Sequence, residues 1–135
     1  MLLIPDDIFA IVTIWQEARG EIHIGKVAVG EVIRNRMKMR YHSDGTAAGT
    51  VLQPRQFSGW NEGNYNRIIS VKQDAQDPAM MDCARAWLES ETTSYSKGAV
   101  LFEGSRFKTP VWANDPGVVF TVEIGNQKFY KVEKK

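Results

Sequence analysis

Two glutamates four positions apart are the residues best suited to acid–base chemistry in this sequence. Glu17 and Glu21 flank the residues Ala-Arg-Gly near the expected end of a helix. A carboxyl group that is shielded from water and lies near a like charge has a raised pKa, which lets it donate a proton near neutral pH. Arg19 lies between the two glutamates and would oppose that shift. Glu17 is therefore a candidate general acid, and the net direction of its pKa stays open.

The helix that carries Glu17 is expected over residues 6–19, with Pro and Asp at its start and Gly at its end. On a helical wheel the apolar stripe centres on Ile8 and Trp15, and Glu17 falls on the opposite side, beside Thr13. Glutamate is rarely buried, so composition alone favours a solvated surface residue. The wheel neighbours of Glu17, which are Ala10, Thr13 and Ile14, are small or apolar and could line a cleft, so both interpretations stay open.

The remaining patterns predict helices first and strands last. Further helices are expected over about 25–39 and 78–91, loops over 41–50 and 51–60, and strands over 99–102, 118–124 and 128–132. Gly125 and Asn126 form a pair typical of a tight hairpin turn. The third helix should bury a stripe made of Met81, Ala84, Trp87 and Leu88. The sequence thus predicts an α+β fold in one domain, residues 1–135, with helices in the N-terminal two thirds and a small antiparallel β-sheet at the C-terminus.

Composition excludes several classes of function. Of the 135 residues, 43% are hydrophobic and 24% charged, which is typical of a folded domain. A net charge of +1 gives no general attraction to nucleic acid. Cys83 is the only cysteine, and two separated histidines, His23 and His42, lack the spacing of a zinc site. We therefore expect no internal disulfide, no metal and no cofactor.

The N-terminus lacks the basic segment and long apolar run of a signal peptide, and no stretch is apolar enough for a membrane span. We expect synthesis in the cytoplasm without a signal peptide and no stable membrane insertion.

The motifs together resemble the spore cortex-lytic, or cell wall hydrolase, family, which includes many phage endolysins. The resemblance begins with the five contiguous residues Glu17-Ala18-Arg19-Gly20-Glu21 and covers about residues 8–130. Later motifs keep the family's order: Gly25-Lys26-Val27-Ala28-Val29, Asn35-Arg36, Gln53-Pro54, Gln56-Phe57-Ser58, Ala84-Arg85-Ala86-Trp87, Ala99-Val100-Leu101-Phe102, Trp112-Ala113 and Ile124-Gly125-Asn126.

The resemblance implies a lysozyme-like fold and an enzyme that cleaves the β-1,4 bond between N-acetylmuramic acid and N-acetylglucosamine in peptidoglycan. By position, Glu17 is the general acid and base. Family members are described as lytic transglycosylases, which need a single glutamate. A hydrolase would need a second carboxylate, about 5 to 5.5 Å away if retaining and about 6.5 to 9.5 Å away if inverting. Glu21 is the nearby candidate, and for it a structural ion pair or helix cap is an equal alternative.

Six further residues are expected to contact the glycan strand. Amide and hydroxyl groups suit acetamido groups, and aromatic rings stack on sugars, although a tryptophan can equally be buried in the core. The predicted substrate-binding residues are Arg19, Gln56, Ser58, Trp60, Trp112 and Tyr130. Asn35 and Arg36 are read first as hydrogen-bonded scaffold. Three residues depart from the family pattern, namely His23, Glu31 and Glu103, and they bear on substrate contacts more than on the acid.

The resulting hypothesis is a monomeric phage endolysin that reaches the cell wall after a holin permeabilises the membrane. A non-catalytic peptidoglycan-binding module is the first alternative, but it would not need Glu17. An amidase or peptidase commonly needs a zinc cluster or a Cys/His pair, so this sequence favours it least.

Overall fold

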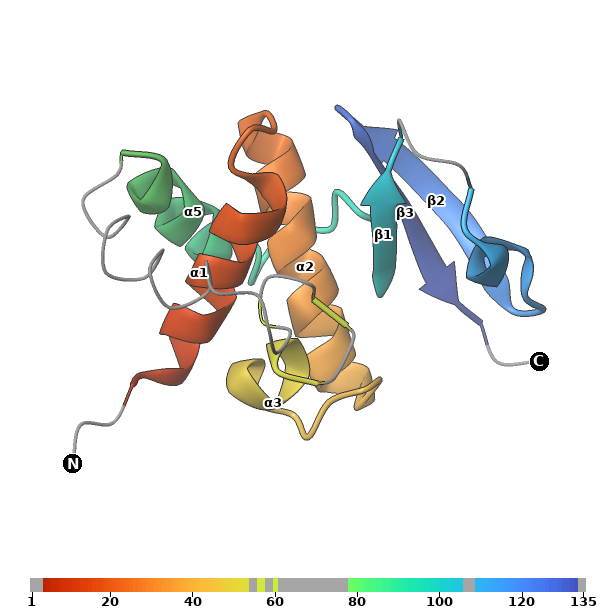
Figure 1. Ribbon diagram of the computed structural model, residues 1–135, viewed down its shortest axis with the longest axis horizontal. Coiled ribbons are helices and arrows are strands. Elements are labelled where there is room, and N and C mark those ends of the chain that lie inside the picture. Colours follow the sequence, from red (N-terminus) through yellow and green to blue (C-terminus); the bar gives the residue numbers. More distant parts are fainter. Residues whose placement is uncertain (1–3, 54–55, 58–59, 61–77, 106–108, 134–135) are drawn as a thin grey trace.

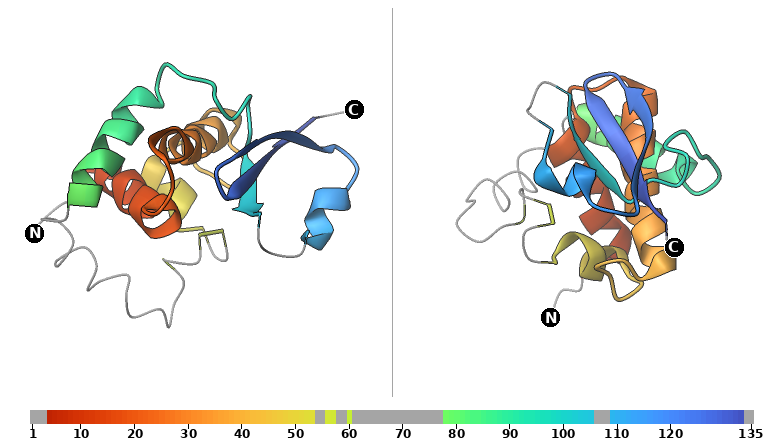
Figure 2. Two further views of the ribbon diagram at one scale, coloured as in Figure 1. Left: turned by 90° about the horizontal axis from the view of Figure 1, so that it is seen from above. Right: turned by 90° about the vertical axis from the view of Figure 1, so that its right-hand side faces the viewer.

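The computed structural model describes residues 4–53, 56–57, 60, 78–105 and 109–133. Helices α1 (Asp6–Ala18) and α2 (His23–Met39) lie side by side at the centre, and α5 (Pro78–Glu89) packs against both (Figure 1). A small sheet lies on the side of α2 away from α5, as Figure 1 and the left view of Figure 2 show. The remaining elements are α3 (Ala47–Val51), β1 (Leu101–Gly104), the 3-10 helix η2 (Val111–Asn114), β2 (Val118–Ile124) and β3 (Gln127–Val132).

The sheet is antiparallel, with the order β1-β3-β2. In its register Phe102 lies opposite Phe129, and Leu101 lies opposite Tyr130. Because side chains alternate along a strand, the two pairs point to opposite faces. The face that carries Phe129 joins the hydrophobic core, which gives the helices and the sheet a shared interior.

The core is built around α2, which is buried on most of its circumference. The apolar residues along its middle, Val27, Ala28, Val29, Val32 and Ile33, are fully buried, as the sequence predicts for this helix, whereas Ile24 and Met39 near its ends are exposed. They pack with residues of α1, α5 and β3. The fully buried apolar members from these elements are Ala10, Ile14, Val27, Ala28, Val29, Val32, Ile33, Cys83, Ala86 and Phe129.

The predicted fold class is confirmed, and the bounds of α1, α2, α5, β2 and β3 agree with the predicted ranges to within about two residues. The first strand begins two residues later than predicted. Val100 is fully buried and its N–H donates to the carbonyl of Tyr130 at 2.9 Å, so the sheet pairing starts just before β1. No helix in the described part of the chain is long and apolar enough to cross a membrane.

Helix α3 lies within the region predicted as loop, so that prediction is wrong for Ala47–Val51. The Thr46 hydroxyl accepts a hydrogen bond from the N–H of Gly49 at 2.9 Å. The carboxylate of Asp6 accepts from the N–H groups of Ala47 and Ala48, both at 2.8 Å. A short helix of weak propensity is therefore stabilised by a cap from a residue 41 positions away, which no local pattern reveals.

The buried face of α5 also differs from the predicted stripe. Met81 and Leu88 are 60% and 69% exposed, whereas Cys83 and Ala86 are fully buried. Trp87 is the residue that the predicted and observed faces share, and its indole N–H donates to Asp7 at 2.9 Å. The observed buried face is rotated by about one residue position around the helix from the predicted stripe. The prediction rests on the general preference of large apolar side chains for the interior, which Met81 and Leu88 do not follow.

Removal of the Phe129 side chain tests the shared interior. We expect Phe129→Ala to lower the free energy of unfolding by about 3–5 kcal/mol, because a large aromatic ring at full burial leaves a cavity. The matched control Leu88→Ala removes an exposed side chain and should change it by less than about 0.5 kcal/mol. Urea denaturation followed by circular dichroism measures both, and equal losses would contradict this account of the core.

Candidate active site

Glu17 lies in the last turn of α1, and its side chain is half-buried. Burial raises the pKa of its carboxyl group, and the guanidinium of Arg36 on α2 opposes part of that rise. The carboxyl group therefore does not lie in bulk solvent. The sequence left open whether the pKa of Glu17 is raised or lowered, and the structure indicates that it is raised. The cation that opposes the rise is Arg36, whereas the sequence suggested Arg19.

The backbone of Glu17 is tied to the sheet. The side-chain amide of Gln127, the first residue of β3, donates to the carbonyl of Glu17 at 3.1 Å. Gln127 is itself buried. The last turn of α1 thus contacts α2 on one side and the sheet on another, which fixes the position of Glu17.

Arg36 is 3% exposed, which is rare for a cation, and its hydrogen bonds account for its position. Its Nε donates to the carbonyl of Val100 at 2.6 Å, and its Nη1 donates to Oε1 of Gln56 at 3.3 Å. The guanidinium also lies 4.8 Å from the ring centre of Phe57. Burial lowers the pKa of Arg36 to about 10, so it stays charged at neutral pH and holds Gln56 in place.

Trp60 reaches the same face of α1 as Glu17. Its indole N–H donates to the hydroxyl of Thr13 at 2.7 Å, and its ring contacts Phe9 with centroids 5.7 Å apart. Thr13 lies one helical turn before Glu17, so the two side chains share a face. Of the predicted substrate residues, Gln56 contacts Arg36, the cation that acts on Glu17, and Trp60 contacts Thr13 on the Glu17 face of α1. Ser58 lies outside the described residues.

Glu21 points to the hairpin between β2 and β3. Its Oε1 accepts from the backbone N–H of Asn126 at 2.8 Å, and its Oε2 lies 3.4 Å from the Asn126 side-chain amide. These contacts support the structural alternative for Glu21, although with a different partner from the helix cap that the sequence suggested.

Arg19 is engaged on the other side of α1. Its guanidinium lies 4.2 Å from the ring centre of Trp15, and its Nη1 donates to the Trp15 carbonyl at 3.4 Å. Arg19 is exposed, and a position two residues from Glu17 faces away from it on a helix. The structure does not bring Arg19 to the acid.

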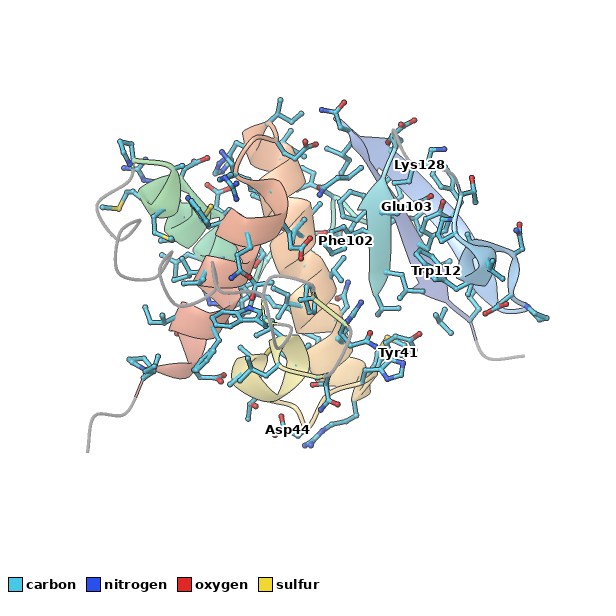
Figure 3. The ribbon with its side chains drawn as sticks, viewed as in Figure 1. Tyr41, Asp44, Phe102, Glu103, Trp112 and Lys128 are labelled. Carbon is cyan, nitrogen blue, oxygen red and sulfur yellow. The ribbon has the colours of Figure 1, made fainter. Side chains whose placement is uncertain are left out.

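Tyr130 and Trp112 form a second group, on the sheet face opposite Phe129. Their rings meet edge to face with centroids 5.1 Å apart, and the Tyr130 hydroxyl donates to Glu103 at 2.8 Å. Burial, followed by the Glu103 contact, raises the pKa of Tyr130 to about 12. Figure 3 shows Glu103 and Trp112 on the sheet side of the molecule.

His23 forms a charge cluster that the sequence did not reveal. Its two ring nitrogens lie 2.8 Å from Asp82 and 2.9 Å from Glu89, and Lys26 donates to Asp82 at 2.7 Å. The hydrogen bond to Glu89 is the largest cause of the raised pKa of His23. This cluster joins α2 to α5 and is separate from the acid. The spacing of Asp82 and Glu89, two turns apart on α5, is the sequence feature that could have indicated this cluster.

Glu31 is a buried carboxylate with a full set of partners. It accepts hydrogen bonds from the hydroxyl of Thr93 at 2.5 Å, the N–H of Tyr95 at 2.9 Å and the N–H of Ser96 at 2.7 Å. It therefore holds the segment that leads from α5 to the sheet. Of the three departures from the family pattern, Glu31 and His23 serve packing between elements, and Glu103 binds Tyr130.

The geometry supports proton transfer by one carboxyl group. Glu17 has a raised pKa, a fixed backbone and a buried cation nearby that is held in place by its own partners. Among the described residues, no group of three or more His, Cys, Asp or Glu side chains is arranged to hold a metal ion.

The fold and the site together define an α+β domain with a desolvated glutamate at the end of its first helix. The family described as Cell Wall Hydrolase matches residues 20–130, and the chain belongs to that family. This confirms the resemblance found in the sequence. The match begins after Glu17, so it does not itself assign the acid.

A spore cortex-lytic enzyme of Oceanobacillus iheyensis is 33% identical over 82 residues, which is 61% of this chain and 28% of that protein. The chain thus spans less than a third of that relative's length.

Two solved structures share the fold. The catalytic domain of the germination-specific lytic transglycosylase SleB from Bacillus anthracis has a TM-score of 0.68 and 23% identity, with 96% of this chain and 97% of that chain covered. The catalytic domain of the Bacillus cereus SleB protein has a TM-score of 0.64 and 22% identity, with 93% and 90% covered. The helices and the small C-terminal sheet are therefore the architecture of these catalytic domains.

Substitution of Arg36 tests the electrostatics of the site. Because Arg36 lowers the pKa of Glu17, we expect Arg36→Gln to raise that pKa further, whereas Arg36→Lys, which keeps the charge, should raise it less. Carboxyl ¹³C NMR of Glu17 during a pH titration measures the shift, with circular dichroism to verify folding. A pKa that falls in Arg36→Gln would show that the cation does not act on the acid.

Proposed function

We propose that this protein cleaves peptidoglycan glycan strands at the β-1,4 bond between N-acetylmuramic acid and N-acetylglucosamine, as a lytic transglycosylase with Glu17 as general acid and base. The observation that carries the proposal is the partly buried Glu17 carboxyl group with its raised pKa. A general acid must be protonated when substrate binds, and desolvation favours the protonated form. Membership of the Cell Wall Hydrolase family supports the substrate class.

The reaction balances with one glutamate. Glu17 donates its proton to the bridging oxygen as the bond from the muramoyl anomeric carbon to that oxygen breaks, which releases the N-acetylglucosamine hydroxyl. The Glu17 carboxylate then accepts the proton of the muramoyl 6-hydroxyl, whose oxygen bonds to the anomeric carbon. The product is a 1,6-anhydro sugar, no water is consumed, and Glu17 ends protonated as it began.

A hydrolytic muramidase with Glu21 assisting is the alternative mechanism. It would need the Glu21 carboxylate to activate a water molecule. The hydrogen bonds of Glu21 to Asn126 favour the one-glutamate mechanism, because they direct that carboxylate to the hairpin.

Substrate contacts are proposed for both sides of the site. Gln56 and Trp60 have contacts that hold them near α1 and α2, where they suit an acetamido group and a sugar face. Trp112 and Tyr130 would bind a more distant part of the strand. Ser58 and Arg19 stay predictions, and the contacts of Arg19 with Trp15 favour it least.

Replacement of the acid tests the proposal directly. We expect Glu17→Gln to reduce release of soluble fragments from purified sacculi by about a hundredfold or more, because it removes the proton donor and keeps the side-chain shape. The matched control Glu91→Gln removes an exposed carboxylate two residues after the end of α5 and should retain full activity. Unchanged release by Glu17→Gln would show that another group is the acid.

The products distinguish the two mechanisms. Mass spectrometry of the wild-type digest should show muropeptides that end in 1,6-anhydro-N-acetylmuramic acid, each lighter by one water molecule than a hydrolysis product. Products with reducing N-acetylmuramic acid ends would support the muramidase. Protein that binds to sacculi without releasing fragments would support a non-catalytic binding module.

The pH dependence follows from the raised pKa of Glu17. Activity needs the protonated acid, so it should fall as pH rises through that pKa, and burial moves this fall to higher pH than for a solvated glutamate. A pH profile of kcat on solubilised glycan strands measures it. A profile that already falls at the pH expected for an unperturbed glutamate would contradict the assignment.

The proposal extends to a biological setting. Action as a monomeric endolysin in phage-driven host lysis, with access to the wall through a holin lesion, stays a prediction. Expression in a bacterial host with and without a holin tests it, because lysis should require both proteins.

A further inference from the structure

The contacts of Glu21 form a clamp between the helices and the sheet. We propose that Glu21 is a positioning residue: its carboxylate holds the β2–β3 turn against the corner between α1 and α2, and so fixes Glu17 relative to the sheet. This inference rests on the proposed function of Glu17, and it assigns to the second glutamate of the motif a role other than catalysis.

The strongest contact of the clamp is a charge-assisted hydrogen bond. The backbone N–H of Asn126 donates to Glu21 Oε1 at 2.8 Å, across 105 positions of sequence. The carbonyl of the same residue accepts from the N–H of Ser105 at 2.6 Å, directly after β1. The turn is therefore held by its backbone on both sides, by the helix corner and by the end of the first strand.

Two glycines make room for this contact. A Cβ atom on Gly125 would lie 2.7 Å from Glu21 Oε1, and the φ angle of Gly125 is +57°. A Cβ atom on Gly25, in the first turns of α2, would lie 3.2 Å from the Cβ of Glu21. Both the turn and α2 thus approach the Glu21 side chain more closely than other residues would allow.

The clamp continues to the acid. Gln127 follows the clamped turn directly, and its side-chain amide donates to the carbonyl of Glu17 at 3.1 Å. The sheet therefore contacts the α1 corner at Glu17 and again at Glu21, four residues later. Loss of the Glu21 contact would leave the Gln127 bond as the hydrogen bond that ties this turn to the acid.

A matched pair of variants separates the contact from the charge. Glu21→Gln and Glu21→Ala both remove the negative charge, but the glutamine oxygen can still accept from the Asn126 N–H. We expect Glu21→Gln to keep kcat within about twofold of wild type and Glu21→Ala to lose about tenfold or more, because small displacements of an acid are costly in rate. Asn126→Ala keeps the backbone contact and is the control, with kcat near wild type.

The pH profile adds a readout that a purely stabilising role would not change. When the turn loosens, water reaches Glu17 and its pKa falls, so the fall in activity should occur at lower pH in Glu21→Ala than in Glu21→Gln. If Glu21 were catalytic, both variants would be inactive. If it only stabilised the fold, both would keep the wild-type kcat and pH profile below their melting temperatures. Either result would overturn the proposal.

Amide hydrogen exchange keeps this test independent of the proposed function. The Asn126 amide should exchange about tenfold faster or more in Glu21→Ala than in Glu21→Gln, whether or not the protein cleaves glycan. If the wild-type protein is inactive but the two variants show this exchange difference, the proposed function is refuted while the clamp is still supported. Equal exchange in both variants would refute the clamp alone.

Discussion

The site depends on keeping a carboxyl group partly out of water without leaving it uncompensated. Burial disfavours the charged form of Glu17, while the buried guanidinium of Arg36 favours it. The role proposed for Glu17, to donate a proton and then accept one, needs both influences. Too much desolvation would prevent the carboxylate from forming, and too little would leave the carboxyl group ionised before substrate binds. Arg36 can exert its effect because the Val100 carbonyl and Gln56 hold it in place.

The architecture supplies these groups from distant parts of the chain. Helix α2 is the common partner: it packs on α1 and α5, carries Arg36, and lies beside the sheet whose hairpin reaches back to the end of α1. Buried carboxylates and amides complete the junctions, with Glu31 holding the approach to the sheet and Gln127 holding the acid's own turn. The fold thus places its polar contacts where elements must meet at defined positions.

The sequence predicted most of what local patterns control. The apolar periodicity located α1, α2 and α5, and the Gly125-Asn126 pair located the hairpin, because helices and tight turns leave their signal in adjacent residues. It failed where the cause is distant. The cap that Asp6 provides for α3, the exposed Met81 and Leu88, and the partners of His23 all depend on contacts between separate elements. Arg36 was predicted as hydrogen-bonded scaffold, and its bonds to Val100 and Gln56 agree with that prediction. Its effect on the pKa of Glu17 depends on contacts between separate elements, so no local pattern indicated it.

The hairpin contacts have a consequence for the order of events during synthesis. Gln127 and Glu17 are separated by 110 positions, and Asn126 and Glu21 by 105. On a ribosome the helices emerge long before the last strand, and non-local pairings of this kind form late in folding. A nascent chain that has made its helical bundle therefore still lacks the sheet contacts of its acid. The contacts that tie Glu17 to the sheet are therefore completed only at the end of translation.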